Sequence, residues 1–211
     1  MTGRARGWTG PLEAFALLTA IPVPARAAQS ARGVLPWAPL PGLVLGGSRS
    51  GKSAHAEALL ADAGDVTYLA TSPPVPGDAE WAERVAAHRA RRPAGWTTLE
   101  TTAPSDLLRR GTVLVDSITT WVTALMDETG VWTDEPGAHD RLARRCDALV
   151  EAWTMTPAHV VAVSDEVGLG VVPETRSGRL FRDTLGSVNQ RLAGTADEVW
   201  FVLAGLPQRL R

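Results

Sequence analysis

Residues Gly46-Gly47-Ser48-Arg49-Ser50-Gly51-Lys52-Ser53 follow the apolar run Leu43-Val44-Leu45 and precede a helical pattern. They match G-x-x-x-x-G-K-[ST], a loop that joins a strand to a helix. The backbone N–H groups of such a loop turn toward phosphate oxygens, and the helix dipole adds positive potential. Lys52 would reach the outer phosphates of a nucleotide and the Ser53 hydroxyl would ligate Mg²⁺. The alternative is a glycine-rich turn that binds no ligand.

On the carboxyl side of this loop, short apolar runs alternate with longer helical patterns, which predicts an α/β domain with a mostly parallel sheet. The expected strands are Leu43–Leu45, Val66–Ala70, Thr112–Val115, His159–Val163 and Glu198–Leu203. The expected helices are Lys52–Ala61, Ala79–Arg91, Ser117–Asp127, His139–Trp153 and Arg176–Ala193. The residues Thr129–Gly137 are predicted to form a loop, because glycines and a proline interrupt the helical periodicity.

An acidic residue at the end of a buried strand is the second part expected of such a site. The run Thr112-Val113-Leu114-Val115 ends in Asp116. Asp116 would hold the Mg²⁺ shell or orient an acceptor hydroxyl. It could equally cap the helix that starts near Ser117, since aspartate is a favoured N-cap residue, and both roles can coexist.

Length and composition limit the remaining possibilities. A chain of 211 residues fits one domain or one domain with an appendage. The formal net charge of −2 gives no global field for nucleic acid, so any anion must be bound locally. The single cysteine, Cys146, excludes an internal disulfide and a cysteine metal cluster, and the four histidines show no zinc-ligand spacing. Lys52 is the one lysine among 21 basic residues.

The first 42 residues differ from the rest and are interpreted as an extension that precedes a domain over residues 43–211. Residues 1–44 carry four arginines and one glutamate, whereas the rest of the chain is net acidic. A short helix over Leu12–Ala20 followed by a proline-rich linker is expected. A secretory signal is the alternative, but Glu13, Pro22 and Pro24 interrupt its apolar run.

A histidine lies among arginines in the predicted helix 79–91. His88 shares a helix face with Trp81 and Val85. Arg84 and the run Arg89-Ala90-Arg91-Arg92 flank it. Such a cluster would gather nucleotide phosphates beside a neutral imidazole that can act as a nucleophile. A solvated basic helix face is the bland alternative, and the residues alone leave both open.

Taken together, residues from about 43 to 211 resemble the bifunctional adenosylcobinamide kinase/adenosylcobinamide-phosphate guanylyltransferases. The matching pieces, in chain order, are GGSRSGKSAHAEAL (46–59), YLATS (68–72), ERVAAHRARRPAGW (83–96), VLVDSITTWV (113–122), DEVGLGVVPETRSGRLFRD (165–183) and NQRLAGTADEVWFVLAGLP (189–207). Asp165 departs from the family, which more often has asparagine there. Residues 11–46 are in addition similar to the opening of cobalamin synthase, a membrane-embedded enzyme.

The resemblance implies a P-loop NTPase (RecA-like) three-layer fold and a two-step enzyme. ATP or GTP would phosphorylate adenosylcobinamide, and GMP would then pass from GTP to adenosylcobinamide-phosphate through a GMP-histidine intermediate, which here implies His88. By the same likeness the guanine nucleotide would contact the phosphate loop and a further set of residues: Ala70, Thr71, Ser72, Arg89, Ala90, Arg91, Arg92, Glu100 and Asp116.

The resemblance further implies a homotrimer. The phosphate-loop motif predicts Mg²⁺ as the cofactor, the single cysteine fits a cytoplasmic location, and the net charge favours no nucleic-acid partner. The opening of the chain suggests transient contact with membrane-bound cobalamin synthase. Two other functions stay open: a small-molecule kinase that performs only the first step, and a nucleotide-binding module whose catalysis is degraded.

Overall fold

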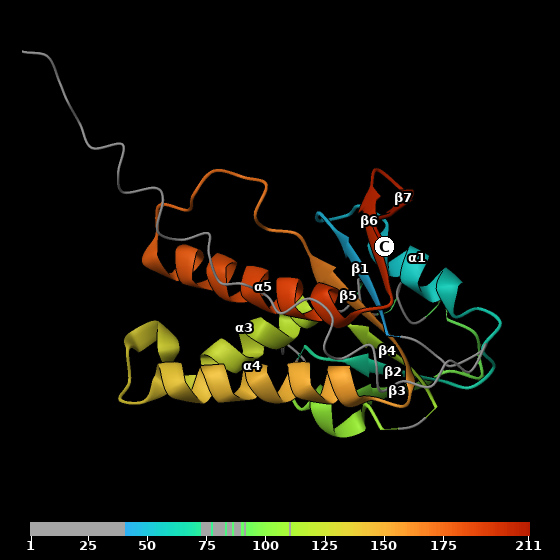
Figure 1. Cartoon of the computed structure of the whole chain (residues 1–211), viewed down its shortest axis with the longest axis horizontal. Helices are drawn as coiled ribbons and strands as arrows, with labels where there is room; N and C mark the ends of the chain where they lie inside the picture. Colours follow the sequence, from blue (N-terminus) through green and yellow to red (C-terminus); the bar gives the residue numbers. More distant parts are fainter. Residues whose placement is uncertain are drawn as a thin grey trace, which may run out of the picture. The chain divides into compact units, whose positions relative to one another are not determined.

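A seven-stranded sheet forms the centre of the computed structural model, which describes residues 41–72, 77, 83, 86, 90, 92–109 and 111–211. The strand order is β3-β2-β4-β5-β1-β6-β7. All neighbouring strands are parallel except β6 and β7, which pair antiparallel (Figure 1). The strands are β1 (Gly42–Gly46), β2 (Val66–Ala70), β3 (Thr97–Glu100), β4 (Thr112–Asp116), β5 (His159–Asp165), β6 (Glu198–Leu203) and β7 (Leu206–Arg209).

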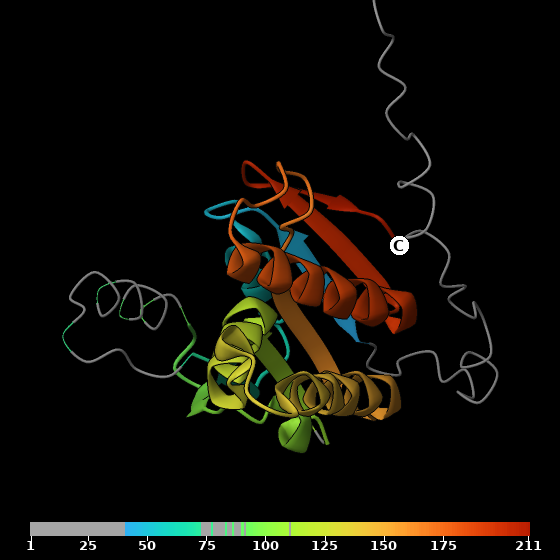
Figure 2. The same cartoon turned by 90° about the vertical axis from the view of Figure 1, so that its left-hand side faces the viewer.

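Helices cover both faces of the sheet, which explains why the central strands are apolar on both sides. On one face lie α3 (Ile118–Thr129), α4 (Ala138–Met155) and α5 (Arg176–Thr195), and Figure 2 views the molecule from their side. On the other face lies α1 (Lys52–Leu59). The buried side chains accordingly form two clusters, a large one under α3, α4 and α5 and a smaller one under α1. The result is a three-layer α/β fold.

Local sequence explains where α3 and α5 begin. Ser117 caps α3, because its side chain accepts a hydrogen bond from the Thr120 backbone N–H. The Thr120 hydroxyl oxygen in turn accepts one from the Ser117 backbone N–H. Thr175 caps α5 by accepting from the backbone N–H of Gly178. Ser117 therefore lies just before α3 and not within it.

The five predicted strands and four of the five predicted helices are confirmed, with ends shifted by a few residues. The predicted helix Ala79–Arg91 lies mostly outside the described residues; its described positions Glu83, Ala86 and Ala90 are helical. The loop predicted over Thr129–Gly137 is wrong in part, because it includes the last residue of α3 and a 3₁₀ turn, η3 (Val131–Thr133). A second 3₁₀ turn, η2 (Pro104–Leu107), precedes β4.

Two strands were not predicted, β3 and β7, and both are sheet edges. Their side chains are mostly exposed, so neither carries a buried apolar run. The proposed extension and its short helix lie outside the described residues, apart from Pro41 and Gly42, so the division into an extension and a domain stays a prediction. Within the described part of the chain, no helix has the length and apolarity needed to cross a membrane.

Candidate nucleotide-binding site

The predicted site residues gather at the carboxyl edge of the parallel strands. Gly46, the last residue of β1, is aligned with Asp165 at the end of β5. On the next strands along the sheet, Asp116 ends β4 and is aligned with Ala70 at the end of β2, which in turn is aligned with Glu100 at the end of β3. Residues far apart in sequence thus form one row. This edge of an open α/β sheet is where such folds bind ligands.

The phosphate loop turns sharply between β1 and α1. Gly51 caps α1 in a left-handed conformation, with φ of 94°, which a side chain would disfavour. Gly46 is restricted by space: a Cβ there would lie 2.6 Å from the carbonyl oxygen of Val202. The Gly205 backbone N–H donates to the Ser50 carbonyl oxygen at 2.8 Å, so the β6–β7 turn supports the loop. Gly47, Ser48 and Arg49 are exposed at its tip, whereas Ser50 is buried.

Lys52 is engaged by protein groups in this structure. Its Nζ lies 2.6 Å from Asp165 Oδ1 and donates to the Gly47 carbonyl oxygen at 3.1 Å. The Asp165 backbone is anchored in turn, because its N–H donates to Thr119 Oγ1 and its carbonyl oxygen accepts from Asn189 Nδ2. The ammonium group is therefore held at the loop by a carboxylate.

Asp165 was not among the predicted site residues. The signal for it was available, since Asp165 follows the apolar strand predicted at His159–Val163 much as Asp116 follows Thr112–Val115. The sequence could not show that β5 lies directly beside β1, which is what brings Asp165 to Lys52.

Asp116 faces Ser53 in the first turn of α1. Its Oδ1 lies 3.5 Å from the Ser53 hydroxyl, which is long for a hydrogen bond. Its Oδ2 accepts a 2.7 Å hydrogen bond from the Tyr68 hydroxyl. Burial and the neighbouring Asp116 carboxylate raise the pKa of Tyr68 well above its ordinary value. The Tyr68 hydroxyl therefore stays protonated and remains a hydrogen-bond donor. Tyr68 was not identified as a site residue from the sequence, because strand periodicity marks it only as a core residue.

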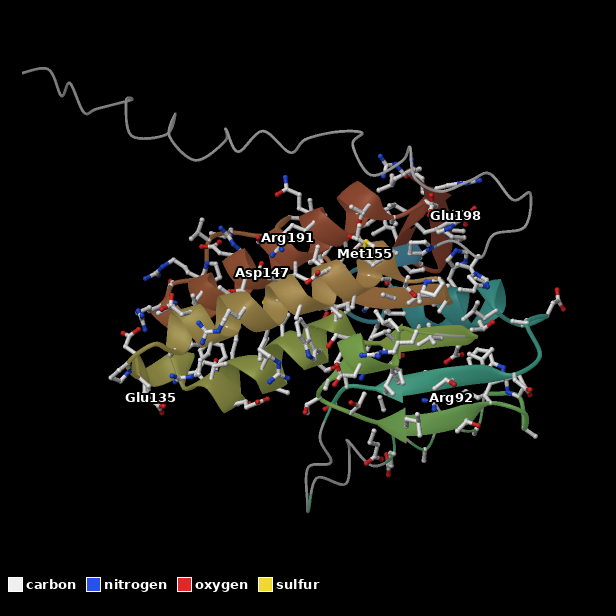
Figure 3. The ribbon with its side chains drawn as sticks, turned by 60° about the horizontal axis from the view of Figure 1, so that its bottom comes forward. Arg92, Glu135, Asp147, Met155, Arg191 and Glu198 are labelled. Carbon is white, nitrogen blue, oxygen red and sulfur yellow. The ribbon has the colours of Figure 1, made fainter. Side chains whose placement is uncertain are left out.

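Arg92 lies away from the phosphate loop, along β2 and β3 (Figure 3). Its guanidinium carbon lies 3.2 Å from the centre of the Tyr68 ring, and its Nη1 donates to Thr98 Oγ1 at 2.8 Å. In this structure the Arg92 guanidinium group thus interacts with side chains of β2 and β3.

The remaining predicted residues divide into three groups. Thr71 is fully buried and exchanges hydrogen bonds with the Ser117 backbone, so it joins β2 to the start of α3. Ala70 and Ser72 flank it with partial exposure, and Glu100 is exposed at the end of β3. His88, Arg89 and Arg91 lie outside the described residues; Ala90 between them is helical and exposed.

The arrangement has groups of the kind that bind phosphate oxygens and a divalent cation. Backbone N–H groups at the start of α1, one ammonium group, one serine hydroxyl and two carboxylates converge on the end of β1. The described residues contain no cluster of three or more histidine, cysteine or acidic side chains of the kind that holds a metal by protein ligands alone.

The chain matches a family model described as cobinamide kinase / cobinamide phosphate guanyltransferase over residues 42–210. It is 44% identical over 180 residues to the bifunctional adenosylcobalamin biosynthesis protein CobU of Salmonella typhimurium, covering 80% of this chain and 98% of that protein. It is 41% identical over 176 residues to the corresponding CobP protein of Pseudomonas aeruginosa, covering 80% of this chain and 96% of that protein.

Among solved structures, an ATPase of a type III secretion system of pathogenic bacteria matches with a TM-score of 0.50 and 13% sequence identity. The match covers 77% of this chain and 50% of the ATPase, so the chain spans about half the length of that protein. At this identity the likeness concerns the fold alone, and it agrees with the expected P-loop NTPase architecture.

Proposed function

This chain belongs to the cobinamide kinase / cobinamide phosphate guanyltransferase family, and we propose that it performs both reactions at the loop after β1, with His88 as the carrier of GMP. The observation that carries the proposal is the row of groups at the carboxyl edge of the sheet. Lys52, Ser53 and Asp116 come together there from α1 and β4. The location in the cytosol and the homotrimer implied by the family resemblance are part of the same proposal.

Phosphate binding falls to the loop and the start of α1. The backbone N–H groups that follow Gly47 would bind the phosphate oxygens, and Lys52 would exchange Asp165 for the outer phosphates. The tight packing of Gly46 and Gly51 against β6 and its turn keeps the loop in this shape before a ligand binds. Little conformational entropy is then lost on binding.

Ser53 and Asp116 are the residues that would hold Mg²⁺. Their donor atoms fit that ion, because a hydroxyl and a carboxylate are hard oxygen ligands and Mg²⁺ takes few protein ligands beside phosphates and water. The two oxygens face each other at 3.5 Å without a short hydrogen bond between them. Bound there, Mg²⁺ would neutralise charge on the transferred phosphoryl group and the leaving phosphate.

In the first reaction the substrate hydroxyl attacks the γ-phosphorus of ATP or GTP. An O–P bond to adenosylcobinamide forms, the bridging bond to the β-phosphate breaks, and the hydroxyl proton leaves. Lys52 would stabilise the charge on the phosphate oxygens, and Asp116 would orient the hydroxyl.

In the second reaction a ring nitrogen of His88 attacks the α-phosphorus of GTP, and pyrophosphate leaves. A phosphate oxygen of adenosylcobinamide-phosphate then attacks the same phosphorus and frees the imidazole, giving adenosylcobinamide-GDP. Dividing the transfer into two displacements lets one site serve the donor and the acceptor in turn. Arg89 and Arg91, which flank His88 in sequence, would attract the phosphates.

The test is intact-protein mass spectrometry after incubation with GTP and Mg²⁺, with and without acid treatment. Wild-type protein should gain one GMP that acid removes, because a phosphoramidate is acid-labile, and His88→Ala should gain none. His139→Ala is the matched control, since His139 is an exposed histidine in the first turn of α4, where it contacts Asp134. It should be labelled like the wild type.

The other results separate the alternatives. Protein that binds GTP and phosphorylates adenosylcobinamide without ever carrying GMP would be a kinase only. Protein that binds GTP and does neither would be a binding module. An adduct that persists in His88→Ala would show that another residue is the nucleophile.

A further inference from the structure

Tyr68 connects the middle of the sheet to the proposed metal position. It is 4% exposed, and its hydroxyl donates to Asp116 Oδ2 at 2.7 Å. Tyr68 is aligned with Leu114 on the neighbouring strand, two residues before Asp116. Side chains two residues apart on a strand point to the same face. Tyr68 and Asp116 therefore both lie on the face covered by α1, which carries Ser53.

The hydrogen bond assigns one carboxylate oxygen of Asp116 to Tyr68. The terminal torsion of an aspartate is broad, so hydrogen bonds to its oxygens decide which way each oxygen points. With Oδ2 accepting from Tyr68, Oδ1 is the oxygen directed at Ser53. The two oxygens of one side chain are thus divided between a buried donor and the nucleotide site.

The tyrosine ring is itself held in place. The Arg92 guanidinium carbon lies 3.2 Å from the ring centre, and Arg92 is fixed to β3 through Thr98. Arg92 precedes β3, Tyr68 lies in β2 and Asp116 ends β4, so these contacts lie in the β3-β2-β4 half of the sheet. The chain of contacts runs from that edge of the sheet to Ser53.

We propose that Tyr68 is a positioning residue for the bound nucleotide, acting through Asp116 by directing Oδ1 toward the Mg²⁺ that Ser53 and Asp116 would hold. The inference rests on the metal role assigned to Asp116 under the proposed function. Partners behind a metal ligand commonly change metal affinity by about 10–100-fold when they are removed. Removing the Tyr68 hydroxyl should therefore weaken the part of nucleotide binding that needs Mg²⁺.

The experiment measures the affinity of the full chain for the fluorescent analogue mant-GTP in EDTA and in saturating Mg²⁺. The dissociation constant in EDTA divided by the dissociation constant in Mg²⁺ is the gain in affinity due to Mg²⁺. Tyr68→Phe, which keeps the ring under Arg92, should lower this ratio by about tenfold and leave the affinity in EDTA unchanged. Thr156→Val is the control, because it removes another buried hydroxyl, which donates to the Leu108 carbonyl oxygen at 2.6 Å on the segments that lead into β5 and β4. It should leave the ratio unchanged.

A double substitution separates action through Asp116 from an independent effect. If Tyr68 acts through Asp116, then Tyr68→Phe should have no further effect on the ratio in Asp116→Asn protein. A full tenfold effect in that background would overturn the proposal, and so would an unchanged ratio in the single Tyr68→Phe variant. Thermal unfolding of each variant verifies that it is folded. The measurements use His88→Ala protein, because in Mg²⁺ a wild-type His88 would take up GMP from the analogue. The readout is therefore binding alone.

Discussion

Lys52 already has a negatively charged partner before any nucleotide is bound. The Asp165 carboxylate lies 2.6 Å from its ammonium group, and the two side chains are 27% and 12% exposed. Incoming phosphates must displace this carboxylate, and the cost is the energy of a partly solvated ion pair, about 1 kcal/mol. Asp165 therefore competes with the ligand for the loop lysine.

Asp165→Asn should bind mant-GTP about fivefold more tightly than the wild type in EDTA, since about 1 kcal/mol of competing interaction is removed. Titration of mant-GTP fluorescence measures the change. Asp147→Asn is the control, because Asp147 pairs with Arg191 at 2.8 Å between α4 and α5 (Figure 3), and it should bind as the wild type does. Weaker binding by Asp165→Asn would mean that Asp165 assists the nucleotide and does not compete with it.

Two of the three glycines of α5, Gly178 and Gly186, have opposite surroundings. A Cβ at Gly178 would lie 2.8 Å from Pro173 Cβ and 2.9 Å from Thr175 Oγ1, the group that caps the helix. At Gly186 the same Cβ would meet nothing within 4 Å. Helix propensity favours alanine over glycine equally at both positions. The packing of the helix start, which propensity does not include, makes them different.

Gly186→Ala should raise the free energy of unfolding by about 1 kcal/mol, in line with helix propensity. Gly178→Ala should lower it by about 1 kcal/mol or more, because the new methyl group displaces the Thr175 cap. Urea unfolding of the two variants beside the wild type measures both changes. Equal stabilisation by the two substitutions would show that the start of α5 can adjust to a side chain.

Burial raises the pKa of the Cys146 thiol and of the Tyr68 hydroxyl, which should make the stability of the whole fold sensitive to alkali. The pKa of the Cys146 thiol is raised to about 11, and the pKa of Tyr68 is raised further above its ordinary value. Both groups are neutral when protonated, so the folded state retains protons that the unfolded chain releases. The stability that they contribute is complete below the unfolded pKa values and is lost as pH rises.

The free energy of unfolding should therefore fall from about pH 9 upward, with each group contributing about 1 kcal/mol per pH unit within its range. Cys146 should act first, between its ordinary pKa of 9.0 and about 11, and Tyr68 should act above its ordinary pKa of 10.0. Urea unfolding at a series of pH values measures the slope. Cys146→Ala should flatten the slope between pH 9 and 10, and an unchanged slope would exclude the thiol as its source.

The candidate nucleotide site could be proposed from the sequence because its main parts are local. The phosphate loop is one continuous motif, and its spacing alone specifies the glycines, the lysine and the serine. Asp116 was found because it ends an apolar strand, and five strands were found because burial on both faces leaves a run of apolar residues. The family was also evident from collinear motifs over most of the chain, and the comparisons confirm it.

The order of the strands in the sheet decided the rest. No local pattern states that β5 lies beside β1, so the pairing of Asp165 with Lys52 followed only from the fold. No local pattern distinguishes a core tyrosine from one whose hydroxyl reaches across to Asp116. The edge strands β3 and β7 were missed because their exposed residues carry no periodic apolar signal. Sequence determines what one segment does by itself, whereas contacts between distant segments depend on how the sheet is assembled.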